Sequence, residues 1–396
     1  MKKILISLIA AVAALSGCAS VDNASAQKAP KHYDVCAIVW PAYHPAPRWK
    51  ELGIFDHNNG EWQNVYEAKP KYPGHNQPKV PLWGYEHEDN PIAVARKIDA
   101  ALAAGINIFM YDWYWYGNRP FLENALNNGF LKAPNNERMR FFIMWANHDV
   151  TSLWNNKSDD RGVIWNADVS YDEFTKVLVP RFIAYFKKPN YYKIEGKPVF
   201  GLYLLRTMVR GMGGAENAKK AFEFFRAEVK KAGFPDIFVM SNTTSYKGFK
   251  FEIEGDKKPS PEKVLKYFGI DAVSLYNWTG SRNGTYTKWR DLNIPTWDKF
   301  KEEAGIFFPT VSTGWDTTPR YIKYTPDVKE RSPLEYEKAL RAAAAWDDKN
   351  LPEGMPKLIM INAWNEWTEG EYLEPDSEFG YGFLNATARV FGPNAE

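Results

Sequence analysis

The sequence predicts an α/β protein with a single (β/α)8 barrel, a TIM barrel, whose strands are followed by long loops. Three observations support this prediction: eight short apolar runs, segments of helical spacing between them, and no linker within residues 32–396. Continuously apolar runs are typical of strands that are buried on both faces of a parallel sheet. Strands that alternate with helices along one stretch of this length favour one closed barrel over two domains.

The expected barrel strands are short, and turn residues bound each of them. They are residues 35–40, 106–111, 141–145, 199–203, 237–240, 272–276, 306–311 and 358–361. The longest insertion, residues 41–90, contains Pro, Gly, Asn, Trp and Tyr but no long apolar run. It therefore predicts an extended loop after the first strand.

Helical spacing between the strands is clearest in residues 92–104, 171–186, 218–232 and 333–346. Asn90, Ser170 and Ser332 precede three of these segments and are expected to cap their first turns. Gly105 and Gly233 follow two of them and are expected to end the helix directly before the next strand. The repeated order of helix, tight turn and strand agrees with a barrel.

Residues 1–17 have the pattern of a secretory signal and resemble the signal of a bacterial lipoprotein. Two lysines precede the apolar run 4–15, which Leu15-Ser16-Gly17-Cys18 closes with small residues. The run is too short to span a bilayer, and we expect Cys18 to become the acylated N-terminus of the mature chain. Residues 18–31 are small and polar and predict a flexible tether. The expected location is the bacterial cell envelope, with a lipid anchor in the periplasm or at the outer-membrane surface.

Composition excludes several classes of function. A formal net charge of +2, with no runs of Lys or Arg, argues against a nucleic-acid partner. The only other cysteine, Cys36, lies in an apolar run, so a disulfide framework is excluded. The six histidines show no metal-ligand spacing, and we expect neither a metal site nor a cofactor. The 16 Trp and 22 Tyr instead indicate a ligand with apolar faces and many hydroxyls, such as an oligosaccharide or polysaccharide.

Two carboxylates follow the last expected strand, set among indole rings. Residues 358–370 run from an apolar stretch into Glu366 and Glu369, with Trp364 and Trp367 beside them. Hydrolysis of a glycosidic bond needs one acid for the leaving oxygen and a second group as base or nucleophile. An isolated Glu-x-x-Glu is more often only an acidic loop after a buried strand than a catalytic pair. The residues at the other strand ends decide between these two interpretations.

Polar groups and indoles recur at nearly every expected strand end, which is where a barrel enzyme places its chemistry. The residues expected to bind substrate are His44, Asp112, Trp113, Trp115, Trp145, Asn147, Asn277, Trp278, Trp315, Asp316, Trp364, Asn365 and Trp367. The same strand ends carry further residues without an assigned role, namely Trp40, Tyr114, His148, Asp149, Asn242, Tyr276 and Arg320. Together they predict a polar, aromatic pocket suited to carbohydrate.

The chain also resembles a known family. The segment Trp364-Asn365-Glu366-Trp367-Thr368-Glu369-Gly370, followed by Leu373-Glu374-Pro375, is similar to the signature of glycoside hydrolase family 99 endo-mannosidases. A wider pattern resembles the WbsX-like relatives of that family. It comprises Lys69-Pro70, Pro73-Gly74-His75, Asp112-Trp113-Tyr114-Trp115, Trp145-Ala146-Asn147, Gly314-Trp315-Asp316 and Tyr381-Gly382-Phe383-Leu384. The resemblance extends from about residue 39 to residue 391, nearly the whole mature chain.

The resemblance implies a role for each acid. Glu369 would be the general acid/base, and Glu366 would take a proton from the sugar's own 2-hydroxyl, which then attacks the anomeric carbon. An aligned intramolecular nucleophile of this kind can reach an effective molarity of about 10⁵ M or more. The chain departs from the mannosidase pattern at Thr368, where that motif usually has His, and in the composition of the loop at Glu371-Tyr372. The sugar and its linkage therefore stay open.

These observations predict a lipid-anchored, secreted glycoside hydrolase that acts on an α-linked glycan, with mannose as one candidate sugar. A glycosyltransferase is the second hypothesis, because WbsX-like proteins have carried that label. An exported lipoprotein lacks nucleotide-sugar donors, however, and no nucleotide-binding fingerprint follows a strand. A non-catalytic glycan-binding protein is the third, although it would not need both Glu366 and Glu369. The glycan, endo or exo action, the membrane face of the anchor and the oligomeric state stay open.

Overall fold

The computed structural model describes residues 32–55, 58–152, 155–158 and 162–395. One compact unit begins at Tyr33 and includes all the secondary structure given below. The expected signal peptide, Cys18 and the tether lie outside the described residues. Within the described ranges, no helix combines the length and the hydropathy that crossing a membrane requires.

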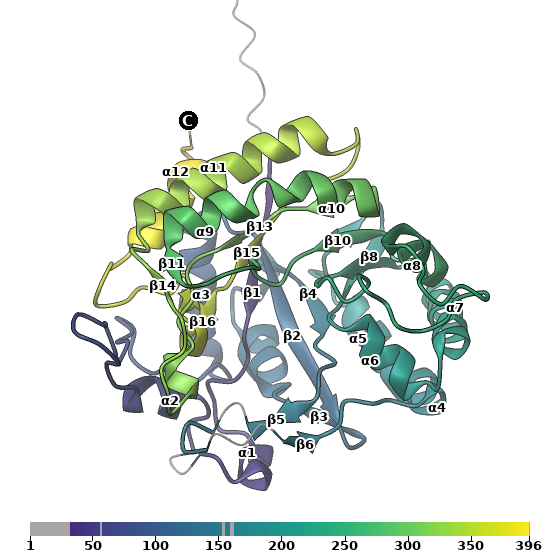
Figure 1. Ribbon diagram of the computed structural model, residues 1–396, viewed down its shortest axis with the longest axis horizontal. Helices are drawn as coiled ribbons and strands as arrows, with labels where there is room; N and C mark the ends of the chain where they lie inside the picture. Colours follow the sequence, from purple (N-terminus) through teal and green to yellow (C-terminus); the bar gives the residue numbers. More distant parts are fainter. Residues whose placement is uncertain (1–31, 56–57, 153–154, 159–161, 396) are drawn as a thin grey trace, which may run out of the picture. The chain divides into compact units, whose positions relative to one another are not determined.

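A parallel sheet forms the centre of this unit (Figure 1). Its strands follow the order β12-β10-β9-β8-β4-β2-β1-β15-β13, and every neighbouring pair is parallel. Their bounds are β1 (Asp34–Val39), β2 (Ile108–Tyr116), β4 (Arg140–Trp145), β8 (Lys197–Leu202), β9 (Phe238–Ser241), β10 (Ala272–Ser274), β12 (Phe307–Phe308), β13 (Thr310–Ser312) and β15 (Leu358–Asn362). Each expected strand run is therefore present in the sheet.

The expected strand at residues 306–311 is divided, and this division brings the sheet ends together. Pro309 separates β12 from β13, because proline has no N–H to donate to a ladder. β12 pairs with β10, whereas β13 pairs with β15. The two pieces of one segment thus contact both ends of the sheet, which forms a nearly closed barrel. Shorter strands make antiparallel or two-stranded additions, among them β3 (Arg119–Phe121), β5 (Val150–Thr151), β6 (Val163–Trp165), β7 (Lys193–Ile194), β11 (Gly284–Thr285) and β14 (Val328–Lys329).

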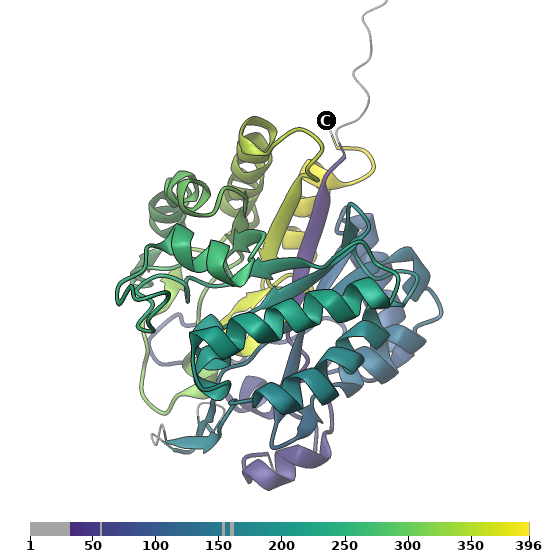
Figure 2. The ribbon, with the colours of Figure 1, turned by 90° about the vertical axis from the view of Figure 1, so that its right-hand side faces the viewer.

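Helices cover the outside of the sheet, as the second view shows (Figure 2). Their bounds are α1 (Pro47–Leu52), α2 (Trp62–Glu67), α3 (Pro91–Ala103), α4 (Tyr171–Glu173), α5 (Val179–Phe186), α6 (Leu205–Gly211), α7 (Ala215–Lys231), α8 (Pro261–Phe268), α9 (Tyr286–Asn293), α10 (Thr296–Ala304), α11 (Pro333–Asn350) and α12 (Gly382–Phe391). The side chain of Asn90 accepts from the backbone of Ile92 at 3.0 Å, and Ser170 and Ser332 cap α4 and α11 in the same way. The expected caps and the four expected helices are confirmed.

One expected helix, residues 171–186, contains an irregular turn. A π-helical stretch, Phe174–Leu178, connects α4 to α5. Pro180 is the second residue after this stretch, and a proline inside a helix removes one hydrogen bond and displaces the carbonyl one turn earlier. The chain stays helical because Phe182 and Phe186 are buried against Phe200 of β8.

Candidate active site

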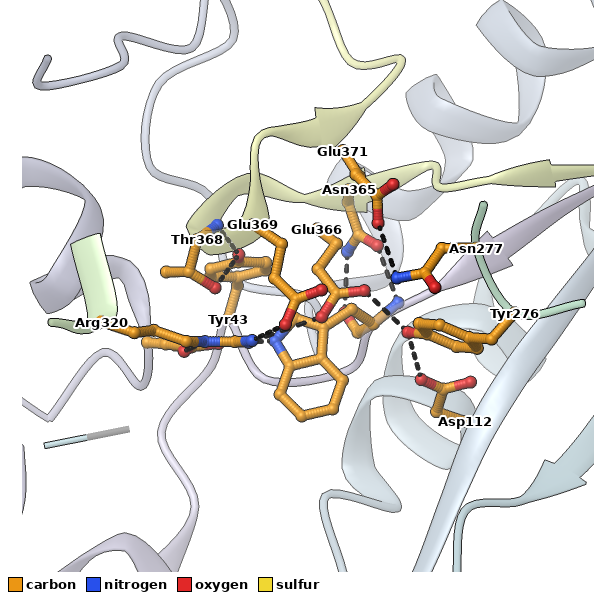
Figure 3. Close-up of polar contacts among 12 residues, drawn as sticks. Tyr43, Asp112, Tyr276, Asn277, Arg320, Asn365, Glu366, Thr368, Glu369 and Glu371 are labelled. Carbon is orange, nitrogen blue, oxygen red and sulfur yellow. Dashed lines mark hydrogen bonds and ion pairs between the residues drawn. The ribbon is translucent and has the colours of Figure 1, made fainter. Parts of the chain in front are cut away.

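Both glutamates lie on one tight turn after β15. Strand β16 (Asn365–Glu366), the 3₁₀-helix η7 (Trp367–Glu369) and β17 (Glu371–Tyr372) form this turn, and β16 pairs antiparallel with β17. Gly370 lies at the turn with a φ of 66°, and a Cβ there would lie 2.8 Å from the backbone nitrogen of Asp316. Glycine is therefore required both for the left-handed conformation and for the close approach. The turn directs the two carboxyl groups to the same side (Figure 3).

Asn365 fixes this turn to the end of β1. Its side-chain oxygen accepts from the backbone nitrogen of Trp40 at 2.8 Å, and its side-chain nitrogen donates to the backbone oxygen of Trp40 at 2.8 Å. The Tyr43 hydroxyl accepts from the backbone nitrogen of Thr368 at 3.1 Å. Asn365 is fully buried, so its role in this structure is to position its neighbour Glu366.

Arg320 contacts three carboxylates, those of Glu61, Glu366 and Glu369, and Figure 3 shows it beside the last two. Its Nε and Nη2 contact the two oxygens of Glu61 at 2.6 and 3.0 Å, and its Nη1 lies 2.5 Å from Glu369 Oε1. Nη2 also lies 3.5 Å from Glu366 Oε1. Burial alone would lower the pKa of Arg320, but the negative charges of Glu61 and Glu369 outweigh it and raise the pKa. The guanidinium is therefore a permanent cation between the two candidate catalytic acids.

Tyr276, which follows β10, connects Glu366 to Asp112 of β2. The Tyr276 hydroxyl lies 2.7 Å from Glu366 Oε2 and 2.9 Å from Asp112 Oδ2. A phenol has one proton and donates to one of these carboxyls only, so the other must be protonated in order to donate to the phenol oxygen. Burial raises the pKa of Asp112 well above its usual range. Burial raises the pKa of Glu366 as well, so at least one of these two carboxyls keeps its proton.

The pKa values of both catalytic candidates, Glu366 and Glu369, are raised. Burial raises the pKa of Glu366 well above its usual range and the charge of Glu369 raises it further, while Arg320 opposes both effects. Burial also raises the pKa of Glu369, against the nearby charges of Arg320 and Arg282. Two carboxyls this close and this buried do not both ionise readily. The pair is therefore suited to holding one proton between them, as acid/base catalysis requires.

A third carboxyl, Glu371, completes a tight acidic group. One oxygen from each of Glu366, Glu369 and Glu371 lies within 4.8 Å of the others. Burial raises the pKa of Glu371 well above its usual range, and Asn277 Nδ2 donates to its Oε2 at 3.4 Å. Oxygens in this arrangement are of a kind that binds divalent cations. Among the described residues, Arg320 already places a positive charge beside two of the three.

A cavity of about 420 Å³, which we name the catalytic pocket, opens above the two glutamates. Its size falls within the range of pockets that bind small ligands. Its lining combines acids, cations and aromatic rings: Trp40, Asp112, Tyr114, Met144, Ala146, His148, Tyr203, Leu204, Arg206, Tyr276, Asn277, Arg282, Trp315, Arg320, Glu366 and Glu369. Of the residues expected to bind substrate, Asp112, Asn277 and Trp315 lie here together with the expected catalytic acids.

The other residues expected to bind substrate lie outside the catalytic pocket. They are His44, Trp113, Trp115, Trp145, Asn147, Trp278, Asp316, Trp364, Asn365 and Trp367. Successive side chains of a strand point to opposite faces. Asp112 and Tyr114 of β2 therefore face the pocket, whereas Trp113 packs against Phe182 of α5 at 5.0 Å and Trp115 donates to Glu173. The sequence predicts that Asp112, Trp113 and Trp115 all bind substrate, whereas the structure divides them between two faces.

The remaining members of that group have structural contacts that explain their burial. Trp367 stacks on Tyr372 with 3.8 Å between ring centres, and Asn147 hydrogen-bonds both backbone polar groups of Leu204. Trp145 packs on Phe174, Trp278 on Trp289, and Trp364 on Phe109, while burial lowers the pKa of His44 to about 4. Asp316 binds His75 and Gln77 in a neighbouring hollow. Most of the tryptophan that indicated a carbohydrate surface thus forms the core beneath it.

The structure also adds residues that sequence reasoning did not assign. Five of them, Trp40, Tyr114, His148, Tyr276 and Arg320, are among the strand-end residues without an assigned role in the sequence analysis, whereas Tyr203 ends a predicted strand but is not among those residues. Glu61, Arg206 and Arg282 carry no such signal, because each lies in a loop or at a short helix and reaches the site only through the fold. Tyrosines and arginines, more than tryptophans, surround the two glutamates.

Comparisons with known sequences identify a family and two relatives. The family model described as "Glycosyltransferase WbsX" matches residues 35–387. Two curated relatives, both named "Uncharacterized protein WxcX" and from two strains of Xanthomonas campestris pv. campestris, are 24% identical over 373 residues. These alignments cover 89% of this chain and 49% of the relatives, so the chain spans about half the length of the curated relatives it matches.

Solved structures share the fold. A "Glycoside hydrolase-like protein" superposes with a TM-score of 0.57 at 15% identity, over 91% of this chain and 94% of the other. The GH99 endo-alpha-mannosidase from Bacteroides thetaiotaomicron, in complex with BIS-TRIS-propane, gives a TM-score of 0.57 at 14% identity, over 90% and 96% of the two chains. At these identities the likeness concerns the fold, and it confirms the predicted (β/α)8 barrel.

Proposed function

The chain belongs to the WbsX family, and we propose that it is a glycoside hydrolase that cleaves an α-linked glycan with retention of configuration. The observation that carries this proposal is the pair Glu366 and Glu369, buried beside Arg320 in the catalytic pocket with raised pKa values. The fold shared with a structure named as an endo-α-mannosidase supports the α linkage and makes mannose one candidate sugar.

In the proposed mechanism, Glu366 removes the proton of the sugar's 2-hydroxyl while Glu369 protonates the leaving oxygen. The bond between the anomeric carbon and the leaving oxygen breaks, and the 2-oxygen bonds to that carbon. Water, deprotonated by Glu369, then opens this three-membered ring, and Glu366 returns its proton to the 2-oxygen. Two inversions at one carbon give net retention.

The separation of the acids supports this proposal over inversion. Inverting pairs stand about 6.5–9.5 Å apart so that a water fits between base and sugar. Glu366 and Glu369 bring oxygens within 4.8 Å of one another, and both approach from one turn. A base so near the acid suits a mechanism in which the sugar's own 2-hydroxyl attacks the anomeric carbon.

The resting position of the shared proton adds one step to this mechanism. Arg320 lies 2.5 Å from Glu369 but 3.5 Å from Glu366, which favours the ionised form of Glu369 in the free pocket. The proton therefore passes from Glu366 to Glu369 when the sugar binds. The short distance between the carboxyls allows one bridging water to carry it.

The hydrolase proposal is tested by incubating the purified chain with a panel of plant, fungal and bacterial polysaccharides. Hydrolysis releases new reducing ends, and linkage analysis of the products identifies the bond that is cleaved. Release of oligosaccharides by wild type, abolished in a Glu366→Gln, Glu369→Gln double variant, supports the proposal. Binding of a glycan without release of products would leave a glycan-binding protein as the better description.

Transfer to a sugar acceptor is the second candidate, and the description of the matched family favours it. The same two acids serve transfer if an acceptor hydroxyl replaces water in the second step. Adding an excess of oligosaccharide acceptor to the hydrolysis reaction distinguishes the two activities. A hydrolase gives mainly reducing-end products, whereas a transferase gives longer chains.

A further inference from the structure

We propose that the glycan is acidic, and that a hollow beside the two glutamates binds a carboxylate or a sulfate ester that the glycan carries. This inference rests on the proposed action on glycans and specifies the substrate class. It comes from the distribution of charge over two adjoining cavities.

The hollow adjoins the catalytic pocket and shares one wall with it. Its volume is about 370 Å³, and the shared wall consists of Tyr203, Leu204, Arg206, Tyr276 and Asn277. Its remaining walls carry the hydroxyls of Thr243, Thr244, Ser245 and Thr279, together with Leu275 and Lys247. We name this cavity the side hollow. A glycan unit bound there would lie next to the unit that contacts Tyr276 in the catalytic pocket.

The charged residues that line the side hollow are both cations. Arg206, in the first turn of α6, has no hydrogen-bond or ion-pair partner among the residues that the structure describes. Lys247 Nζ lies 2.7 Å from Glu303 and 4.2 Å from the ring centre of Phe300, so its charge is already matched. Arg206 is therefore the cation that can receive an anion.

A second arginine without a carboxylate partner lies in the catalytic pocket. Arg282 Nη2 donates to Asn277 Oδ1 at 3.2 Å and to the backbone oxygen of Trp278 at 3.1 Å. Its guanidinium carbon lies 3.4 Å from the ring centre of Trp315, and its Nε is buried without a partner in the described part of the chain. Arg320 differs, because Glu61 and Glu369 match its charge. Within the described part of the chain, neither Arg206 nor Arg282 directly contacts a carboxylate, although Arg282 is near enough to Glu369 to oppose the rise of its pKa.

Neutral sugars do not need such cations. Hydroxyls, amides and aromatic faces bind a neutral pyranose, and the catalytic pocket offers all of these. A guanidinium instead matches the geometry of a carboxylate or sulfate and forms paired, charge-assisted hydrogen bonds with it. The hydroxyls of Thr244 and Thr279, which have no side-chain partner in the described residues, can donate to the remaining anion oxygens. The side hollow therefore has the donors that an acidic substituent requires, and no Asp or Glu is among its described lining residues.

Two matched pairs of polymers test this inference. One pair is α-1,4-polygalacturonate and its carboxyl-reduced form, and the other is fucoidan and its desulfated form. Binding is measured by calorimetry on the Glu369→Gln variant, and cleavage on the otherwise wild-type chain. We expect at least one acidic polymer to bind about 10-fold or more tighter than its neutral partner, as charge-assisted pairs allow. The preference should shrink as the salt concentration rises.

Arg206→Gln, combined with Glu369→Gln for binding, should remove most of that preference. The matched control is Arg138→Gln, which removes the same charge from an exposed ion pair with Asp99 before β4, at the other end of the barrel strand. Preference within the first pair assigns the substituent to a uronate carboxylate, and preference within the second assigns it to a sulfate ester. Equal or absent binding within both pairs, or a preference that Arg206→Gln leaves intact, overturns the inference.

The inference and the hydrolase proposal fail in different ways. If acidic polymers bind through Arg206 and no polymer is cleaved, the acidic subsite stands and the hydrolase proposal falls. If neutral polymers are cleaved as well as acidic ones, the hydrolase proposal stands and the acidic subsite falls.

Discussion

The hydroxyl of Tyr276, which follows β10, lies 2.7 Å from the carboxyl of Glu366 in β16, the short strand after β15. The contact joins two residues that are 90 positions apart in the chain. It fixes the orientation of one catalytic candidate, and it connects that carboxyl to Asp112 through the same phenol oxygen. The chemistry of Glu366 therefore depends on Tyr276.

We expect Tyr276→Phe to lower kcat by about 10- to 100-fold, the usual effect of losing a partner that orients a reactive group. The hydrogen bond from Tyr276 lowers the pKa of Glu366, so its loss should raise that pKa. If Glu366 is the base, activity rises as pH increases through this pKa, and the rising limb of kcat/KM should move to higher pH in the variant. This role would be contradicted if the rising limb of kcat/KM stayed at the same pH. It would also be contradicted if the exposed control Tyr381→Phe lost as much kcat.

Glu366→Gln and Glu369→Gln should each lower turnover of the natural glycan by about 10²–10⁴-fold while glycan binding stays measurable. An aryl glycoside whose leaving group needs no proton distinguishes the two roles. Glu369→Gln should recover much of the first step on this substrate, and Glu366→Gln should not. The reverse pattern would exchange the acid and the base. Glu216→Gln, at an exposed position in the first turn of α7, is the control for loss of a carboxylate.

Arg320→Met should lower the free energy of unfolding by about 3–5 kcal/mol, because it leaves Glu61 buried without its cation. Denaturant unfolding measures this change. The control Arg341→Met breaks an exposed ion pair with Glu337 and should cost about 0–1 kcal/mol. Similar small losses in both variants would show that Arg320 does not stabilise the site.

Cys18 should carry the lipid that holds the mature chain on a membrane. In cell fractionation, Cys18→Ala should move the protein to the soluble fraction, and a chain that starts at Ala19 should fold without a membrane. Stable anchoring needs more than one acyl chain, which a lipoprotein N-terminus provides. Cys36→Ala is the matched control, since this buried thiol should not affect partitioning. A membrane-bound Cys18→Ala protein would contradict the anchor.

The strands were predictable because each buried strand is a continuous apolar run, and the helices because Asn90, Ser170 and Ser332 occupy cap positions. The acids were predictable because they directly follow the last strand. The residues that line the pocket were less predictable. Side chains alternate along β2, so Tyr114 and Trp113 point to opposite faces, and only the pairing of the strands in the sheet fixes which face lines the pocket. Glu61 and Arg282 come from loops whose path depends on tertiary contacts, so local spacing gave no signal for them.

The central claim is that the sugar's own 2-hydroxyl is the nucleophile and that configuration is retained. The most direct measurement is a proton NMR time course of hydrolysis, run on an α-linked substrate that the protein cleaves and on its 2-deoxy analogue. The first product from the parent substrate should be the α-anomer, before mutarotation, and the 2-deoxy analogue should give no product. Initial release of the β-anomer, or normal turnover of the 2-deoxy analogue, would contradict the proposed mechanism.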